Sequence, residues 1–281
     1  MSRIKTAILL FLFLFSATAF AEIDGIPASV KQGESFPIKI VNKGDVKAVK
    51  AFFLSQKIAL HEIGGTYKAI MGIPLDAKCG KTPLTLLLTG ADGKERKLED
   101  EIAILKNDFP TVWFWLKPAK KKLLLAKDLT QVEWAQIERT LVVDDPEQYW
   151  EGVFRLPVSG EASMYFGTLE RVNKMPRGRH RGFDLAVPIG TPVKAANAGK
   201  IVFARKLQVF GGTMVVDHGL GVHTLYFHLS KFLSAVGDKA SKGDIIALSG
   251  NSGASSGPHL HWGLSVHDLR VDPRQWTKVE M

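Results

Sequence analysis

Short runs of alternating apolar and polar residues, separated by turns that contain glycine, recur over most of this 281-residue chain. In residues 22–108, the apolar side chains of Phe36, Ile38 and Ile40 occupy every second position, and Asp92-Gly93 separates two later runs. A period of two predicts half-buried strands, and Asp-Gly predicts a tight hairpin turn. Several short strands at this spacing predict an N-terminal immunoglobulin-like β-sandwich.

The pattern changes in residues 109–150, which we expect to form a structured connector. A lysine-rich stretch leads to Thr130, and Glu133 follows three residues later. This spacing predicts a capping box at the start of a short helix that carries Ile137 and Leu141.

The β pattern returns in residues 151–281, where the glycine content also rises. The expected strands are Gly182–Val187, Val193–Ala204, Thr213–Val216, Val222–Leu229, Ile245–Ser249 and Leu260–Val266. These residues therefore predict a second domain that consists of strands.

The first 21 residues have the layout of a secretory signal. Arg3 and Lys5 precede an apolar run from Ala7 to Phe15, and Ala19-Phe20-Ala21 is suited to cleavage. The run is shorter than the roughly 20 residues of a membrane-spanning helix, so we expect no stable span after cleavage. The single cysteine, Cys79, excludes an intramolecular disulfide and is expected to be buried.

The formal net charge of +9 comes largely from two basic clusters, residues 117–127 and 171–181. An exported basic protein suits an anionic cell envelope, and no nucleic-acid motif accompanies the charge. We therefore predict no nucleic-acid partner, and solvated surface remains the simplest reading of both clusters.

One histidine motif is misleading. His61-Glu62 begins like the helical zinc-protease motif, but residue 65 is glycine where the second histidine should stand. The surrounding sequence predicts strands and turns instead of a helix, so His61 is read as a strand or surface residue.

Seven of the eight histidines lie beyond residue 179, in three local patterns. His180 and Asp184 flank a glycine-containing bend that would let both reach one ion. Strand alternation predicts that His228 lies on the opposite face from His223 and can join a site that His223 cannot. His259 and His261 share a strand face about 6 to 7 Å apart, which allows two ligands or one ligand and one proton carrier.

These three motifs resemble the signatures of lysostaphin-type (LytM-like) peptidases. The matching segments are His180-x-x-x-Asp184, Tyr226-x-His228-Leu229-Ser230 and Ser256-Gly257-Pro258-His259-Leu260-His261. The resemblance covers nearly all of residues 152–281 and implies an antiparallel β domain that is a zinc endopeptidase of peptidoglycan. The sequence departs from the family pattern after the last motif, where Trp262-Gly263 replaces the usual aromatic-glutamate pair, so the usual glutamate near His261 is absent.

The resemblance also implies the role of each residue. His180, Asp184 and His261 are the expected Zn²⁺ ligands, and His228 and His259 are the expected catalytic residues beside the metal-bound water. Zinc lowers the pKa of bound water and polarises a carbonyl group, and histidine transfers protons near neutral pH. Tyr226 is either a hydrogen-bond donor to this site or a packed strand residue.

Two rival functions have to be weighed. Gly253-x-Ser255-x-Gly257 matches a serine-hydrolase pattern, but Pro258 and a following strand contradict the required strand-to-helix turn. A catalytically weak homologue that binds peptidoglycan or activates an amidase would be expected to have lost ligands. All five expected site residues are present, so an active peptidase is the stronger prediction.

The expected substrate is therefore the peptide stem of peptidoglycan, and the expected location is the periplasm or cell envelope. The sequence leaves open whether the cut bond is a D-alanyl-to-diaminopimelate cross-link or a glycine bridge. We also expect the connector or the front sandwich to cover part of the cleft and restrain the enzyme.

Overall fold

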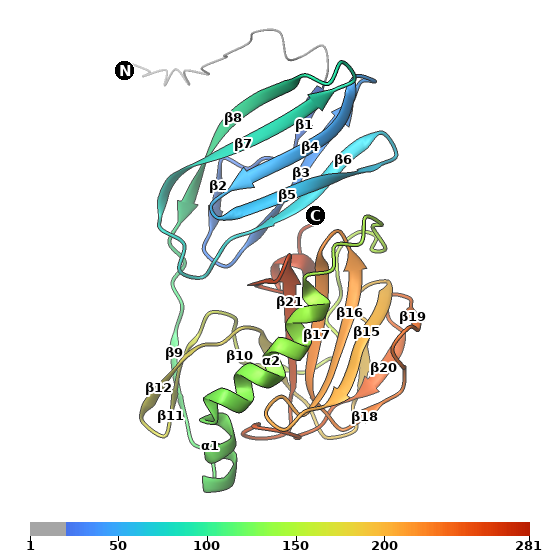
Figure 1. Ribbon diagram of the computed structural model, residues 1–281. Coiled ribbons are helices and arrows are strands. Elements are labelled where there is room, and N and C mark those ends of the chain that lie inside the picture. Colours follow the sequence, from blue (N-terminus) through green and yellow to red (C-terminus); the bar gives the residue numbers. More distant parts are fainter. Residues whose placement is uncertain (1–20) are drawn as a thin grey trace, which may run out of the picture.

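The computed structural model describes residues 21–281 and contains two β-rich parts joined by an extended strand and two helices (Figure 1). The predicted signal, residues 1–21, lies outside the described residues except for Ala21. In the described part of the chain, no helix is long and apolar enough to cross a membrane.

The N-terminal part is a sheet of eight strands in the order β1-β3-β6-β5-β4-β7-β8-β2. The strands are β1 (Ala21–Asp24), β2 (Ser29–Lys31), β3 (Ser35–Asn42), β4 (Val46–Phe53), β5 (Gln56–Ile63), β6 (Thr66–Gly72), β7 (Gly80–Gly90) and β8 (Glu95–Leu105).

Strand β5 allows this sheet to fold over one apolar core. Its first residues pair with β4 and its last residues, from His61, pair with β6. Side chains from both halves, including Ile38 of β3 and Leu86 of β7, then meet in a single buried cluster. The expected hairpin at Asp92-Gly93 joins β7 to β8, and Gly93 has a φ of +75°, which glycine adopts without strain. Cys79 is exposed, so its predicted burial was wrong.

The connector contains β9 (Thr111–Phe114), α1 (Pro118–Leu124) and α2 (Lys127–Leu141). The predicted capping box was wrong, because α2 begins after Ala126 and Thr130 lies inside it. The Thr130 hydroxyl donates to the Ala126 carbonyl at 2.9 Å. Glu133 instead turns away from the helix and accepts backbone N–H groups of Gln208, Val209 and Phe210 at 2.5, 2.8 and 3.4 Å.

The C-terminal part is built on a second sheet, in the order β10-β13-β21-β17-β16-β15-β19, with β22 paired to β21. All of its pairings are antiparallel. Its strands are β10 (Glu161–Met164), β13 (Phe183–Ala186), β15 (Gly199–Lys206), β16 (Gly212–Gly219), β17 (Val222–Leu229), β19 (Lys239–Ala240), β21 (Leu260–Val266) and β22 (Leu269–Val271).

Two small sheets flank this main sheet. The first joins β12 (Met175–Arg179), β11 (Leu169–Val172) and the connector strand β9, which runs parallel to β11. The second joins β14 (Pro192–Lys194), β20 (Ile245–Leu248) and β18 (Lys231–Phe232). A 3₁₀ turn, η2 (Gln275–Thr277), follows the last strand.

The two faces of the main sheet are covered differently. One face packs into a large core that contains Tyr226 and Trp262. On the other face, Ile137 and Leu141 of α2 pack against a cluster that includes Leu225 and Phe227 of β17. Figure 1 shows α2 running across the sheet on this side. The helix thus covers the part of this face that carries Leu225 and Phe227.

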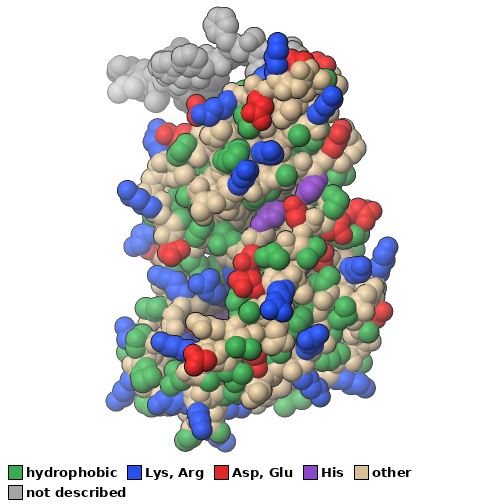
Figure 2. Space-filling model, in the orientation of Figure 1, with side chains coloured by type: hydrophobic (Ala, Val, Ile, Leu, Met, Phe, Trp, Pro, Cys, Tyr) green, Lys and Arg blue, Asp and Glu red, His purple; other side chains and the backbone are tan. Residues whose placement is uncertain are grey.

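The N-terminal sheet contacts the chain end of the C-terminal part through Ser35. Gln275 accepts the Ser35 backbone N–H at 2.9 Å and donates to its carbonyl at 2.8 Å. The indole N–H of Trp276 donates to the Ser35 hydroxyl at 2.9 Å. Charged side chains of both signs are spread over the visible surface of both parts (Figure 2).

The contacts of Glu133 generate a stability prediction. Replacing Glu133 by alanine leaves the buried backbone N–H of Val209 and the partly buried N–H of Gln208 without their acceptor, and a buried donor without a partner costs about 1 to 3 kcal/mol. We expect the Glu133→Ala variant to lose roughly 2 kcal/mol or more of unfolding free energy in urea titrations. Gln131→Ala, an exposed change on the same helix, is the control, and equal stability of the two variants would contradict the assignment.

Candidate active site

The centre of the site is a direct cross-strand pair. Asp184 of β13 lies opposite His261 of β21, and opposed residues of an antiparallel pair point to the same face. The Oδ1 atom of Asp184 lies 2.7 Å from Nδ1 of His261 and 3.0 Å from Nε2 of His180. The ligand atoms of these three buried residues lie within 4.8 Å of one another. Two imidazoles and one carboxylate form a donor set that suits zinc.

Glu170 of β11 supports His180 from behind, and sequence reasoning missed it. Its Oε1 lies 2.6 Å from Nδ1 of His180, and its other oxygen accepts a hydrogen bond from Arg177. A carboxylate accepts from Nδ1–H and leaves Nε2 as the free donor toward a metal. In the sequence, Glu170 is a single acidic residue ten positions before His180. Acidic residues at such a distance are common, so the sequence did not indicate this role.

Backbone packing fixes the orientation of His261. A Cβ atom added at Gly182 would overlap the His261 imidazole near Nε2, so glycine at 182 lets the chain pass directly beside that ring. The His261 ring also stacks on the face of Phe227 of β17, with ring centroids 5.1 Å apart. Nδ1 is therefore the ring nitrogen that faces Asp184 and His180.

His228 reaches the site by a route that alternation did not predict. The pairing of Phe227 with His261 puts Phe227, Leu225 and His223 on the site face, and Tyr226 on the opposite one. Strict alternation would send His228 away with Tyr226, but its φ of +61° turns the chain back. The strand-face argument was therefore wrong, and His223 is kept out by its position at the far end of β17.

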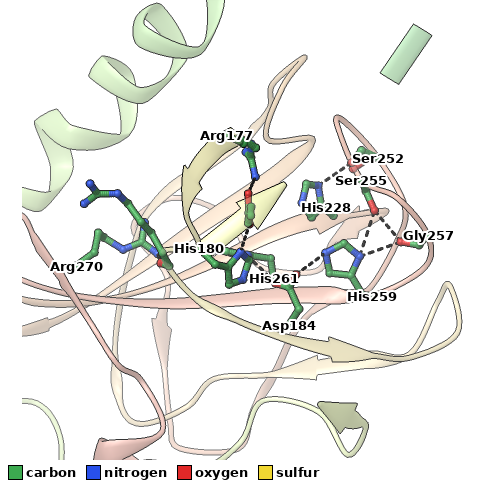
Figure 3. A network of polar contacts seen from close by, with 12 residues as sticks. Arg177, His180, Asp184, His228, Ser252, Ser255, Gly257, His259, His261 and Arg270 are labelled. Carbon is green, nitrogen blue, oxygen red and sulfur yellow. Dashed lines mark hydrogen bonds and ion pairs between the residues drawn. The ribbon is translucent and has the colours of Figure 1, made fainter. Parts of the chain in front are cut away.

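His228 and His259 lie beside each other, with ring centroids 4.9 Å apart, next to His180, Asp184 and His261, which we call the trio (Figure 3). Nδ1 of His228 lies 2.8 Å from the Ser252 carbonyl, and Nδ1 of His259 lies 2.8 Å from the Gly257 carbonyl. Because a carbonyl only accepts, each Nδ1 carries the proton and each Nε2 has a free lone pair. Nε2 of His259 lies 3.6 Å from Asp184.

Burial and neighbouring charges set the protonation of these groups. Burial opposes protonation of His180, but Asp184 and Glu170 outweigh it and raise the pKa of His180 to about 9. Burial lowers the pKa of His261 to about 4. Burial, and then the closeness of the His259 and His261 imidazoles, holds the pKa of His228 well below its usual value. His228 is consequently a neutral base at physiological pH.

All five histidine and aspartate residues line one cavity of about 800 Å³. The connector contributes Phe114, Leu125 and Trp134 to its wall, whereas residues 21–108 contribute none of its lining. Of the two segments expected to cover the cleft, the connector borders it and the N-terminal sheet does not. Whether it restrains activity stays a prediction.

The alternative site features have structural roles. Ser255 is buried, its hydroxyl donates to the Gly257 carbonyl at 2.6 Å, and the chain continues into β21 instead of a helix. The Tyr226 hydroxyl accepts the Ala196 backbone N–H at 3.0 Å in the core on the opposite face. His61 lies in β5 of the N-terminal sheet, with Nε2 2.9 Å from Asp144, and does not line the cavity.

Comparisons with known proteins agree with this geometry. Residues 178–273 match Peptidase family M23. The peptidoglycan DD-endopeptidase ShyA of Vibrio cholerae is 47% identical over 93 residues, which are 33% of this chain and 22% of that protein. Lysostaphin of Staphylococcus simulans is 46% identical over 94 residues, which are 33% of this chain and 19% of that protein.

A solved structure resembles the chain over most of its length. It is described as a putative peptidase M23 from Pseudomonas aeruginosa, and it has a TM-score of 0.64 and 26% identity over 88% of this chain and 93% of that one. Residues 178–273 therefore form a domain of peptidase family M23, which confirms the resemblance of the sequence motifs. The chain spans only 22% and 19% of the length of the two relatives above.

The role of Glu170 can be tested by metal affinity. Removing the carboxylate that orients a metal-ligating histidine typically costs 10- to 100-fold in affinity, so we expect roughly that loss for Glu170→Ala. Competition of the purified protein with a zinc chelator measures it. Glu161→Ala removes an exposed acid from β10 and is the control. Unchanged affinity in folded Glu170→Ala would show that Glu170 does not support the metal site.

Proposed function

We propose that this chain is a zinc-dependent endopeptidase that hydrolyses peptide cross-links of bacterial peptidoglycan. The observation that carries the proposal is the convergence of His180, Asp184 and His261 on one point, with His228 and His259 beside it in the same cavity. The names of its relatives, peptidoglycan DD-endopeptidase and lysostaphin, support the substrate class.

The ligands in this proposal are Nε2 of His180, a carboxylate oxygen of Asp184 and Nδ1 of His261. Two observations support this choice of ligand atoms. The atoms face one another, and Nδ1 of His180, the nitrogen not used for the metal, contacts the Glu170 carboxylate. A zinc ion held by three such ligands supplies a Lewis acid and a bound water of lowered pKa. Because the three ligands are buried, the electrostatic effect of a bound ion on a substrate carbonyl would be stronger than in water.

His228 and His259 are the proposed proton carriers. Each is held by a carbonyl at Nδ1, so neither ring can rotate without losing that bond, and Nε2 stays directed at the cavity. The lowered pKa of His228 keeps its imidazole neutral, so the lone pair of Nε2 is available to accept a proton from water. A histidine that has gained a proton can then stabilise the developing oxyanion or protonate the departing amine.

The remaining parts of the proposal concern organisation and location. We assign residues 1–21 to an export signal, 22–108 to an immunoglobulin-like sandwich, 109–150 to the connector and 151–281 to the catalytic domain. Action on the cell wall requires export, so the proposed location is the periplasm or cell envelope. Retention of all five site side chains argues against a binding-only or amidase-activating homologue.

The test separates metal ligands from proton carriers. Replacing His180, Asp184 or His261 by alanine should lower zinc content and activity on purified sacculi together, because three protein ligands leave none to spare. Replacing His228 or His259 should leave most zinc bound while turnover falls about a hundredfold or more. Metal analysis beside turnover of each variant provides both numbers.

His61→Ala, which changes a histidine outside the site, is the matched control and should keep both zinc and turnover. If His259→Ala loses its zinc while His261→Ala keeps it, the roles of that pair are reversed. If folded His180→Ala retains full zinc and full turnover, the proposed metal site is wrong.

A further inference from the structure

A buried guanidinium lies in the wall of the active-site cavity without an acidic partner. Arg270 of β22 is 4% exposed and lines the cavity that contains His261. Its Nη2 donates to the Arg181 carbonyl at 2.5 Å, whereas its Nε has no hydrogen-bond partner. Within residues 21–281, no carboxylate lies inside the 4.0 Å limit of an ion pair with Arg270. The positive charge is therefore not neutralised by a direct contact.

The guanidinium fits there because residue 263 is glycine. A Cβ atom added at Gly263 would overlap Nη2 of Arg270, so any other residue would displace the guanidinium. The rings of Trp134 and Phe227 flank the charge, with centroids 5.5 and 6.0 Å from Cζ. Aromatic faces attract a cation, but they carry no compensating negative charge. The departure of Trp262-Gly263 from the usual motif thus makes room for a buried cation.

Basic side chains slightly outnumber carboxylates in the wall of this cavity. The wall contains Lys127, Arg177, Arg179, Arg181 and Arg270 beside Glu138, Glu170, Asp184 and Asp268, and Arg177 is already paired with Glu170. Burial, and then the charge of Arg181, lowers the pKa of Arg270 to about 9, against the opposing effect of Asp268. Arg270 consequently remains protonated at neutral pH.

A buried charge is normally paired, because burial without a counter-ion is costly. Arginine pairs best with a carboxylate, through parallel N–H donors. We infer that Arg270 binds a free carboxylate of the peptide substrate, next to the bond that is cut. The inference rests on the proposed function and adds a specificity-determining residue to it. In Figure 3, Arg270 lies on the opposite side of His180 and His261 from His259.

This carboxylate distinguishes the two cross-links that the sequence left open. In a D-alanyl-to-diaminopimelate cross-link, the scissile nitrogen is bonded to a carbon that also carries a carboxyl group. The internal bonds of a glycine bridge have no free carboxyl group at that position. Arg270 therefore selects the first kind of bond.

The experiment compares two synthetic peptides with the zinc-loaded full chain. In both, D-alanine is bonded to the D-centre of diaminopimelate, and that centre carries either a free carboxylate or a carboxamide. We expect kcat/KM to be at least about tenfold higher for the carboxylate, as for a charge-assisted hydrogen bond. Arg270→Gln should reduce this ratio to about one, with the loss mainly in KM and on the carboxylate peptide. Arg205→Gln removes an exposed arginine outside the cavity and should keep the ratio.

Gly263→Ala provides a second variant in case Arg270→Gln does not fold, since it displaces the guanidinium while keeping its charge. It should also abolish the preference. Calorimetric binding of both peptides gives a readout that does not depend on turnover. Wild-type protein without preference in rate or binding overturns the inference. So does an equal loss on both peptides in Arg270→Gln, which would mean that Arg270 only positions the Arg181 backbone. A preference in binding without any cleavage would uphold the carboxylate site but overturn the proposed function.

Discussion

The carboxylate of Asp184 is the interaction on which the site depends. Its Oδ1 atom lies 2.7 Å from Nδ1 of His261 and 3.0 Å from Nε2 of His180. Asp184 of β13 thus connects the neighbouring strand β21 with the loop before β13, which carries His180. The register between β13 and β21 brings Asp184 opposite His261. A shift of one residue would turn one of them to the other face of the sheet. The metal site therefore requires the observed register between β13 and β21.

The connector is part of the structure around the site. Helix α2 covers the same sheet face that carries the trio, and its Ile137 and Leu141 are fully buried there. Glu133 holds the 208–210 segment, whose Phe210 carbonyl accepts the backbone N–H of His228 at 3.1 Å. Protein that begins at residue 151 would lack both the apolar cover and this support. The family match, which begins at residue 178, thus covers less than the structural unit around the site.

Local sequence patterns were sufficient for the parts of the structure that depend on local rules. Short β runs bounded by turns predicted many of the strands, and three short motifs predicted the five side chains that meet in the cavity. The expected single strand Val193–Ala204 was wrong, because the chain forms β14 and β15 there, in two different sheets. The rest depended on contacts between distant segments. His228 escapes alternation because its backbone is left-handed, with a φ of +61° that is rare outside glycine. Glu133 was mistaken for a capping residue, because its partners lie 75 to 77 positions further along the chain.

The proposed function requires this cavity to cut peptide cross-links only when a metal is bound by His180, Asp184 and His261. Mass spectrometry of fragments released from purified sacculi tests it most directly, with the full chain supplied either zinc-loaded or stripped of metal. We expect zinc-loaded protein to convert cross-linked muropeptide dimers to monomers with intact glycan chains, and stripped protein to leave the dimers unchanged until zinc is restored. The same conversion by verified metal-free protein, or products that show only glycan cleavage, would contradict it.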